Sequence, residues 1–569
     1  MSKRRFIKDP VWGNTEIFEW EKELLNHFLL NRLHNVVQTS CAFRVYPGLR
    51  HSRFTHSIGV MHVATQMFVN LVTNSSSQAL DQLRVEQQGV ERIFGSRVNA
   101  AGDHIIKSVC SVTSCPDDWA LLLASVRVAA LLHDIGHLPY SHVFEFALQS
   151  FLDYDLGGYD SPDPLRKQQA ALRRKLTIPQ DSEQTAVSDE AEGRRPHESL
   201  GRNFIYVMIQ DLRSMPGDDA SPVVQACLLT EAANEILNGS SMPISHSLIA
   251  GVLDADRIDF VRRDCMFSGL LTSSVDYNRL FSTYELAQKT DGGYAPRPSL
   301  RAASEAEKLL SERFLEYKYV LAHHKVHLFD ELLERLIYHL ILANRLPRFL
   351  ESLSSLLQVE PEAPVAIADQ VRLAELKQRL LTEFDDPWLE HEIRKGYRES
   401  TNGSDEDKLI RFLFESLVEA RDRFRSLFKR DDAYNDFVER NELGDPLRAD
   451  ETEVALWIAM SVRLKKYEWE IEISKRLNQI TDSEGLSVII GDSLSKITDG
   501  FGQDESAADF FRLSELREFL RHKIASTMPF NAWYMDQGTI TSLGVPTEDW
   551  IEDQIADRLR PIIEAKRAP

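Results

Sequence analysis

The segment Trp119–Leu132, WALLLASVRVAALL, constrains this chain more than any other stretch. Such an apolar run predicts a helix that lies in a protein core. The next ten residues, HDIGHLPYSH (133–142), place three histidines and an aspartate at its end. Burying ionisable groups is costly unless a partner compensates their charge, and a metal ion is the strongest such partner. The sequence therefore raises the possibility of a metal site at the edge of this core.

His133 and Asp134 are neighbours on the helix, so their side chains diverge by about 100° and can meet one ion off its end. Gly136 and Pro139 end the helix, leaving His137 and His142 on the turn beyond. Other segments must supply the remaining ligands, and the candidates are His51, His56, His62, Asp254, Asp256 and Asp259. A mixed imidazole and carboxylate set suits iron, manganese, magnesium or zinc.

Simpler interpretations of the same residues stay open. HDIGH taken alone could be a buried polar turn. His51 and His62 could serve the core, and the acidic cluster 254–264 could be a solvated helix face. The spacing of His133 and His137 also matches a zinc peptidase motif, which requires both histidines within one continuous helix. Gly136 and Pro139 argue against that continuity.

The whole chain bounds the class of protein. Its 569 residues are enough for two or more domains. An excess of acidic over basic residues, 87 against 66, argues against a general nucleic-acid binder. Arg127 interrupts the longest apolar stretch and no hydrophobic segment follows the basic start, which predicts neither a membrane helix nor a secretory signal. Five scattered cysteines fit reduced thiols, so we expect a cytoplasmic protein.

Most of the sequence predicts a mainly α fold. Helices are expected over 327–357, with a break at Pro347, and over 404–428, where Ser404 and Asp407 form a capping-box pair. Strand-like alternation is limited to short stretches such as 41–48 and 486–493. The polar segments 74–104 and 152–196 are interpreted as loops or insertions. We expect a motif-rich part over 1–345 and a helical part for assembly or regulation over 346–569.

Five ordered blocks together resemble the HD superfamily, and within it the deoxynucleoside triphosphate triphosphohydrolases. They are KDPVWG (8–13), VYPGLRHSRFTHSIGV (45–60), HDIGHLPYSH (133–142), HES (197–199) and DADRIDFVRRDC (254–265). The resemblance covers roughly 1–345 and is closest to the human branch that also carries a sterile alpha motif, without a sign of that extra domain here. It implies an HD-type helical core and a divalent metal, held by His56, His133, Asp134 and Asp256.

The resemblance also implies a reaction and its residues. Water would attack the α-phosphorus of a dNTP and give a deoxynucleoside and inorganic triphosphate. His142, and also His137, would be proton donors or phosphate contacts, His197 would support them, and Glu145 would orient the catalytic histidine. Gln38 and Asp264 match contacts to the sugar 3′-hydroxyl, and Arg53, Arg257 and Arg313 match phosphate contacts. Phe260 stands where the family usually has a tyrosine that touches phosphate, so one hydroxyl is missing. Thr39 and Leu321 replace bulky residues that help exclude ribonucleotides, which puts the deoxy-versus-ribo selectivity in question.

Further expectations follow from the same resemblance. A homo-oligomer, tetramer or hexamer, is expected, with a role in dNTP pools or in restricting viral replication. Asn26, Asn31 and His34 replace the residues that read an activating guanine nucleotide in the regulated branch, so we expect such activation to be absent or changed. Two alternatives stay open: an HD-type phosphodiesterase or phosphatase for another nucleotide or signalling phosphoester, and a nucleotide-binding scaffold without turnover.

Overall fold

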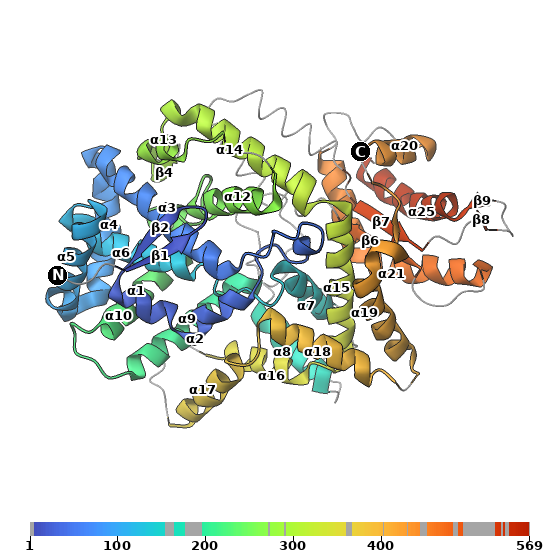
Figure 1. The fold of residues 1–569 in the computed structure, drawn as a ribbon, viewed down its shortest axis with the longest axis horizontal. Coiled ribbons are helices and arrows are strands. Elements are labelled where there is room, and N and C mark those ends of the chain that lie inside the picture. The colour runs from blue at the N-terminus through green and yellow to red at the C-terminus, as the bar shows by residue number, and fades with distance from the viewer. Residues whose placement is uncertain are drawn as a thin grey trace. The chain divides into compact units, whose positions relative to one another are not determined.

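A computed structural model of the chain describes residues 5–153, 164–176, 196–270, 274–289, 292–359, 367–401, 403–429, 431–443, 452–481, 487–492, 528, 530–535, 539–540 and 545–567. Over these residues the fold is mainly helical with a few short antiparallel strands, which confirms the predicted fold class (Figure 1). No described helix combines the length and the apolar character needed to span a bilayer. The chain divides into two compact units, and each is described by itself.

The first unit comprises Met1–Ser40, Gly48–Leu309 and Asn344–His391. Its elements are β1 (Arg5–Asp9), β2 (Gly13–Ile17), α1 (Glu19–Leu25), α2 (Phe28–Asn31), α3 (Arg53–Asn74), α4 (Ser77–Phe94), α5 (Ala101–Thr113), α6 (Ala120–Leu132), α7 (His142–Asp153), α8 (Pro164–Leu176), α9 (Pro196–Ser214), α10 (Pro222–Asn238), α11 (Pro243–Ser247), α12 (Ala255–Ser268), α13 (Tyr277–Ser282), β3 (Tyr284–Gln288), β4 (Tyr294–Pro298), α16 (Pro347–Leu356) and α17 (Ile367–Leu380). Helix α14 (Ala303–Glu316) begins in this unit, and so does α18 (Asp386–Glu399).

Helix α6 is the centre of the first unit, as the apolar run predicts. All of its residues are buried, and it packs against α3, α5 and α10. Its one charged residue, Arg127, donates two hydrogen bonds to the buried carboxylate of Glu21, at 2.6 and 2.8 Å. This pairing compensates the guanidinium inside the core. The helix ends at Leu132, so His133 and His137 do not share a continuous helix as a zinc peptidase motif would require.

Two glycines let other helices approach the site closely. A Cβ atom on Gly59 of α3 would come within 1.9 Å of Asp259 Oδ1, so this glycine allows α3 and α12 to meet. A Cβ atom on Gly136 would come within 1.9 Å of the carbonyl oxygen of His197, at the start of α9. The close approach of α3 to α12, and of the turn at Gly136 to α9, therefore requires glycine, which has no side chain.

The second unit comprises Cys41–Pro47, Leu310–Ala343 and Glu392–Pro569. Its elements are a π-helical turn (Tyr317–Leu321), α15 (His324–Leu342), α19 (Asp405–Arg423), β5 (Arg425–Ser426), α20 (Asp431–Arg440), α21 (Thr452–Thr481), β6 (Val488–Asp492), β7 (Phe530–Tyr534), β8 (Thr539–Ile540), β9 (Val545–Pro546) and α25 (Thr547–Arg567). The antiparallel sheet β5–β7–β6 packs with α21 and α25 around a core that includes Phe428, Ile490 and Phe530.

Several local predictions can be compared with these elements. The break at Pro347 is confirmed, because α15 ends at Leu342 and α16 begins at Pro347. Ser404 caps α19 by accepting a hydrogen bond from the Asp407 amide. The strand within 486–493 is confirmed as β6, whereas 41–48 contains a 3-10 turn over Ala42–Arg44 instead of a strand.

The predicted loop over 74–104 is wrong for most of its length. It contains α4, which buries apolar residues, among them Leu83, Val90 and Phe94, together with the polar Glu86 and Gln87. Within the predicted insertion 152–196, α8 is helical and most of the remainder lies outside the described residues. The division of function between 1–345 and 346–569 stays a prediction.

Candidate active site

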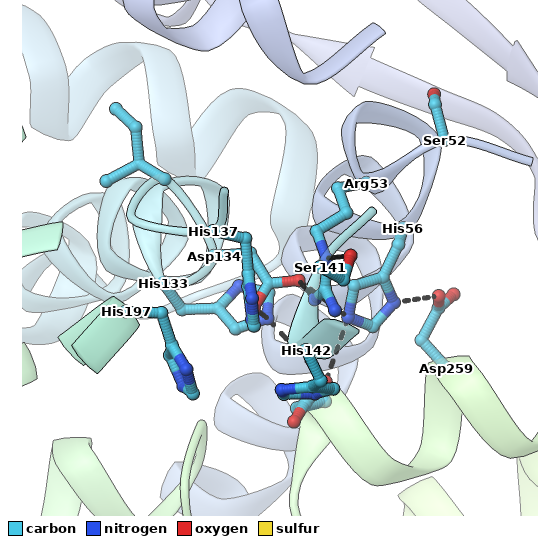
Figure 2. A network of polar contacts seen from close by, with 12 residues as sticks. Ser52, Arg53, His56, His133, Asp134, His137, Ser141, His142, His197 and Asp259 are labelled. Carbon is cyan, nitrogen blue, oxygen red and sulfur yellow. Dashed lines mark hydrogen bonds and ion pairs between the residues drawn. The ribbon is translucent and has the colours of Figure 1, made fainter. Parts of the chain in front are cut away.

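Three helices of the first unit bring the predicted metal ligands together. His56 lies on the first turn of α3, His133 and Asp134 follow the end of α6, and Asp256 lies on the first turn of α12. Figure 2 shows the side chains from α3 and from the end of α6 facing one another. Helix α12 starts where it does because Asp254 caps it, accepting a hydrogen bond from the Arg257 amide at 2.7 Å.

Donor atoms of His56, His133 and Asp256 lie within one group that could hold a metal ion, and Asp134 faces this group with its two oxygens. His56 Nε2 lies 2.8 Å from Asp256 Oδ1 and 3.6 Å from Asp134 Oδ2. His133 Nε2 lies 3.4 Å from Asp134 Oδ1 and 3.6 Å from Asp256 Oδ1. Ligand atoms that each lie about 2.1 Å from one tetrahedral ion are about 3.4 Å apart. Most of these separations therefore already match those around a single bound ion.

Each histidine of this cluster is fixed with Nε2 as its ligand atom. His133 Nδ1 donates to the carbonyl oxygen of Ala130 at 2.8 Å, and its buried Nε2 has no hydrogen-bond partner among the described residues. His56 Nδ1 lies 2.7 Å from Asp259 Oδ2, and since a carboxylate can only accept, that nitrogen carries the proton. The orphaned nitrogen and the two fixed rings fit a divalent metal, and these donors do not select one metal over another.

The histidines and carboxylates of this cluster stabilise one another's charged forms, which shifts their pKa values. Burial opposes the imidazolium of His56, yet its bonds to Asp256 and Asp259 outweigh burial and raise its pKa to about 10. Burial would raise the pKa of Asp134, but Arg53, His133 and His137 together hold it well below its usual range. A metal ion would take over this compensating role, because ligand histidines must be neutral and ligand carboxylates ionised.

A second cluster surrounds the buried carboxylate of Glu145 on α7. His137 Nδ1 lies 2.8 Å from Glu145 Oε1, and His197 Nδ1 and His142 Nδ1 lie 2.9 and 3.3 Å from Oε2. Burial opposes the charge of Glu145, but the three histidines hold its pKa well below the usual value. One carboxylate therefore orients three imidazole rings with Nδ1 as donor and Nε2 directed away.

His137 connects the two clusters. Its Nε2 lies 3.3 Å from Asp134 Oδ1, on the side opposite its bond to Glu145. Burial, with Arg53 and His197 acting in the same direction, lowers the pKa of His137 to about 4. His137 is therefore neutral near pH 7, whereas the side chain of His142 is 41% exposed and can reach a bound molecule.

The predicted substrate contacts of the first unit lie around these clusters. Arg53 donates from Nε to Ser141 Oγ at 2.8 Å and pairs with Asp134 at 2.5 Å. Asp264 Oδ1 lies 2.7 Å from His51 Nε2, and the His51 carbonyl accepts the Gln38 amide at 3.1 Å. Arg257 is buried on α12, with Nη1 bonded to the Val252 carbonyl.

Unused polar atoms mark the predicted sugar contacts. Gln38 Oε1 and Thr39 Oγ1 are buried and make no hydrogen bond among the described residues. Buried polar groups in proteins are nearly always paired, so such atoms are available to a polar ligand. Phe260 is half-buried on α12. Arg313 belongs to the second unit, and its phosphate contact stays a prediction.

The resemblance gave supporting roles to His197 and Glu145, but the sequence reasoning did not single out the residues that support His56. Asp259 was one of three candidate metal ligands, and the structure gives it a supporting position behind His56. Asp259 is held in turn by Arg263 Nε at 2.8 Å and by Trp12 Nε1 at 2.5 Å. The i, i+3 spacing of Asp256 and Asp259 on one helix was the available signal, since such residues share a face.

Comparisons with known proteins find relatives at low identity over part of the chain. No family model matches the chain. An uncharacterized protein of Mycoplasma genitalium is 24% identical over 289 residues, which are 50% of this chain and 48% of the relative. The deoxynucleoside triphosphate triphosphohydrolase SAMHD1 homolog of Dictyostelium discoideum is 28% identical over 154 residues, 27% of this chain and 22% of that protein. A mimivirus protein named for an HD domain is 24% identical over 147 residues, 25% of this chain and 26% of that protein.

These relatives support membership of the HD-domain superfamily. The chain spans about half the length, or less, of the curated relatives it matches. A crystal structure of a phosphohydrolase from Bacteroides thetaiotaomicron has a TM-score of 0.45 and 20% sequence identity, over 74% of this chain and 78% of that chain. A TM-score of that size does not establish a shared fold.

Proposed function

We propose that the first unit hydrolyses deoxynucleoside triphosphates to a deoxynucleoside and inorganic triphosphate with the help of a divalent metal. The observation that carries the proposal is the pair of adjoining clusters, one with the donors of a metal site and one with histidines oriented around Glu145. The SAMHD1 relatives support the choice of dNTPs as substrate. Homo-oligomer formation and a role in dNTP pools or viral restriction stay predictions from the resemblance.

His56, His133, Asp134 and Asp256 would hold the metal. When bound, the metal would lower the pKa of a water molecule and offset negative charge on the phosphate. Arg53 beside Asp134 adds a guanidinium, whose geometry suits phosphate oxygens. The first unit would thus gather positive charge where the triphosphate binds.

His142 is the residue best placed to act as the general acid. Water adds to the α-phosphorus, the bond to the 5′-oxygen breaks, and that oxygen needs a proton as it leaves. Glu145 stabilises the protonated form of His142 through Nδ1, so Nε2 can deliver the proton. Burial lowers the pKa values of both His142 and His137, so the choice between them rests on exposure: the side chain of His142 is 41% exposed, whereas His137 is buried between Glu145 and Asp134. Gln38 and Asp264 would bind the sugar.

Contacts within the first unit support the prediction that guanine-nucleotide activation is absent or changed. Asn31 Nδ2 donates to the Leu25 carbonyl at 2.7 Å, so this amide is engaged by its own loop. His34 stacks on Phe54 with ring centroids 3.6 Å apart. Strong, specific activation by a poorly hydrolysed guanine nucleotide would contradict this part of the proposal.

Product analysis tests the proposal. The four dNTPs and the matching rNTPs are incubated with the protein and added Mn²⁺, Mg²⁺ or Fe²⁺, and the products are separated by ion-exchange chromatography. We expect triphosphate and deoxynucleoside, lost in Asp134→Ala, reduced about 10²- to 10⁴-fold in His142→Ala, and kept in His104→Gln, a histidine outside both clusters. Turnover of another phosphoester in place of dNTPs would favour the phosphodiesterase alternative, and no turnover in a protein that binds no metal would favour the scaffold.

A further inference from the structure

The turn between the two clusters has an unusual backbone. Leu138–Ser141 connects His137 to His142, the first residue of α7. Tyr140 has a φ of +54° and Ser141 a φ of +53°, so two consecutive residues with side chains adopt the left-handed region. Non-glycine residues rarely stay there unless surrounding contacts hold them. Some part of the structure must therefore fix this turn and, with it, the position of His142.

Asp386, far along the chain, holds this turn. One carboxylate oxygen, Oδ1, accepts the Tyr140 amide at 2.7 Å, across 246 positions of sequence. The other, Oδ2, accepts the Val37 amide at 3.0 Å, directly before Gln38. The side chain is buried. One carboxylate thus bonds both the turn that carries His142 and the segment that carries Gln38.

Residues next to Asp386 also make contacts toward the HDIGHLPYSH block, and we call the segment 384–390 the clamp. The Phe384 carbonyl accepts Arg32 Nη1 at 2.7 Å, and the same guanidinium donates to the carbonyls of His137 and Ile135 at 2.7 and 2.5 Å. Glu390 accepts the Tyr140 hydroxyl at 2.8 Å. The clamp therefore contacts the HDIGHLPYSH block directly at the amide and the hydroxyl of Tyr140, and through Arg32 at two carbonyls of the block.

The hydrogen bonds of Asp386 do not cap the helix to which it belongs. Asp386 is the first residue of α18, where a carboxylate commonly caps free amides. Asp385 fills that role, since its Oδ1 accepts the Trp388 amide at 3.0 Å. Both oxygens of Asp386 are instead directed at other segments. The carboxylate is thus used for positioning and not for capping.

We propose that Asp386 is a positioning residue of the active site, which sets His142 and Gln38 by holding the Tyr140 and Val37 amides. This inference rests on the proposed function and deepens it. Asp386 does not touch the reacting atoms. It acts on the rate because a general acid displaced by as little as 1 Å can lose about 100-fold in rate.

The charged groups near Asp386 determine the pH for the test. Burial raises the pKa of Asp386 to about 7, Asp385 and Glu390 act in the same direction, and the two amide bonds oppose the rise. Arg32 is a cation of this region, and burial lowers its pKa to about 10 against the opposing effects of Asp385 and Asp386. At pH 8 the carboxylate is mostly ionised and accepts both amides.

Asp386→Asn is the sharpest variant, because an amide offers one acceptor oxygen in place of two at almost the same volume. At pH 8 we expect kcat to fall about tenfold to 100-fold, with the bound metal per chain unchanged. Hydrogen exchange followed by mass spectrometry should show faster exchange in peptides that contain Tyr140 and Val37. Glu392→Gln, on the same helix with an ion pair to Lys395, is the matched control and should change neither quantity.

Repeating the substitution in a second variant distinguishes a positioning role of Asp386 from a general effect on stability. Glycine adopts positive φ without strain, so Tyr140→Gly lowers the need to hold this turn. Asp386→Asn should then reduce kcat less in the Tyr140→Gly background than in the wild type. An equal loss in both backgrounds, or unchanged kcat and exchange in Asp386→Asn, would overturn the proposal.

The two hypotheses fail in different ways. A wild-type protein that releases no triphosphate from any dNTP refutes the proposed function. The positioning role of Asp386 is then tested by hydrogen exchange alone, and unchanged protection of 138–142 in Asp386→Asn overturns that role as well.

Discussion

Asp259→Asn is the substitution whose effect on the metal site can be worked out most fully from the structure. Asp259 is completely buried and accepts the Nδ1 proton of His56 at 2.7 Å. That bond fixes the ring so that Nε2 faces Asp256 and Asp134. An asparagine can present its NH₂ group to His56, which favours the tautomer with the proton on the ligand nitrogen.

The expected loss is in metal affinity. Removing a carboxylate that supports a ligand histidine typically costs 10- to 100-fold in affinity, or about 1.4–2.7 kcal/mol. Competition with a chromogenic chelator, using Mn²⁺ at pH 7.5, measures the dissociation constant of each variant. Circular dichroism of the same samples without metal reports whether the fold survives.

Asp9→Asn is the matched control. Arg263 is fully buried and bonds both Asp259, at 2.8 Å, and Asp9, at 2.9 Å, so each substitution removes one carboxylate from the same guanidinium. Both variants should lose stability for that reason, but only Asp259→Asn alters the bond to His56. Equal metal affinity of the two variants would refute the supporting role assigned to Asp259.

Three further outcomes are expected. Lys466→Met should lower the free energy of unfolding by about 3–5 kcal/mol in denaturant titrations, because it leaves the buried carboxylate of Glu334, which Lys466 contacts at 3.0 Å inside the second unit, with the Tyr467 hydroxyl as its partner. Lys408→Met, which removes an exposed pair, should cost at most about 1 kcal/mol. The pKa of Asp386 in the folded protein, about 7, exceeds its ordinary value of 3.8, so folding favours the protonated form. The free energy of unfolding should therefore fall as the pH rises from about 4 to 7. Thermal melts of Asp386→Asn at pH 5 and 8 should lack this pH-dependent part of the stability. Mn²⁺ at 100 times its dissociation constant should add about 2.7 kcal/mol of stability, reversed by a chelator, and a melting temperature indifferent to Mn²⁺ would argue against a metal site.

The sequence was sufficient for features that depend on local patterning. The apolar run 119–132 forms a buried helix, and Gly136 and Pro139 follow its end, as helix-breaking residues predict. The strand at 488–492 and the helix break before Pro347 follow from equally local signals. Local signals failed at 41–48, where i to i+3 backbone bonds such as Arg44 N to Cys41 O form a turn despite strand-like alternation. Periodicity alone cannot separate these outcomes in so short a segment.

The sequence by itself determined that histidines and carboxylates stand at the end of a core helix, and which residue types could hold a metal. Only the tertiary structure decided how they are used. The roles of Glu145 as shared acceptor of three rings, of Asp259 behind His56 and of Asp386 across 246 positions come from contacts between separate segments. The sequence around a carboxylate does not indicate which buried donor it will bind, because that partner is determined by the packing of helices far apart along the chain.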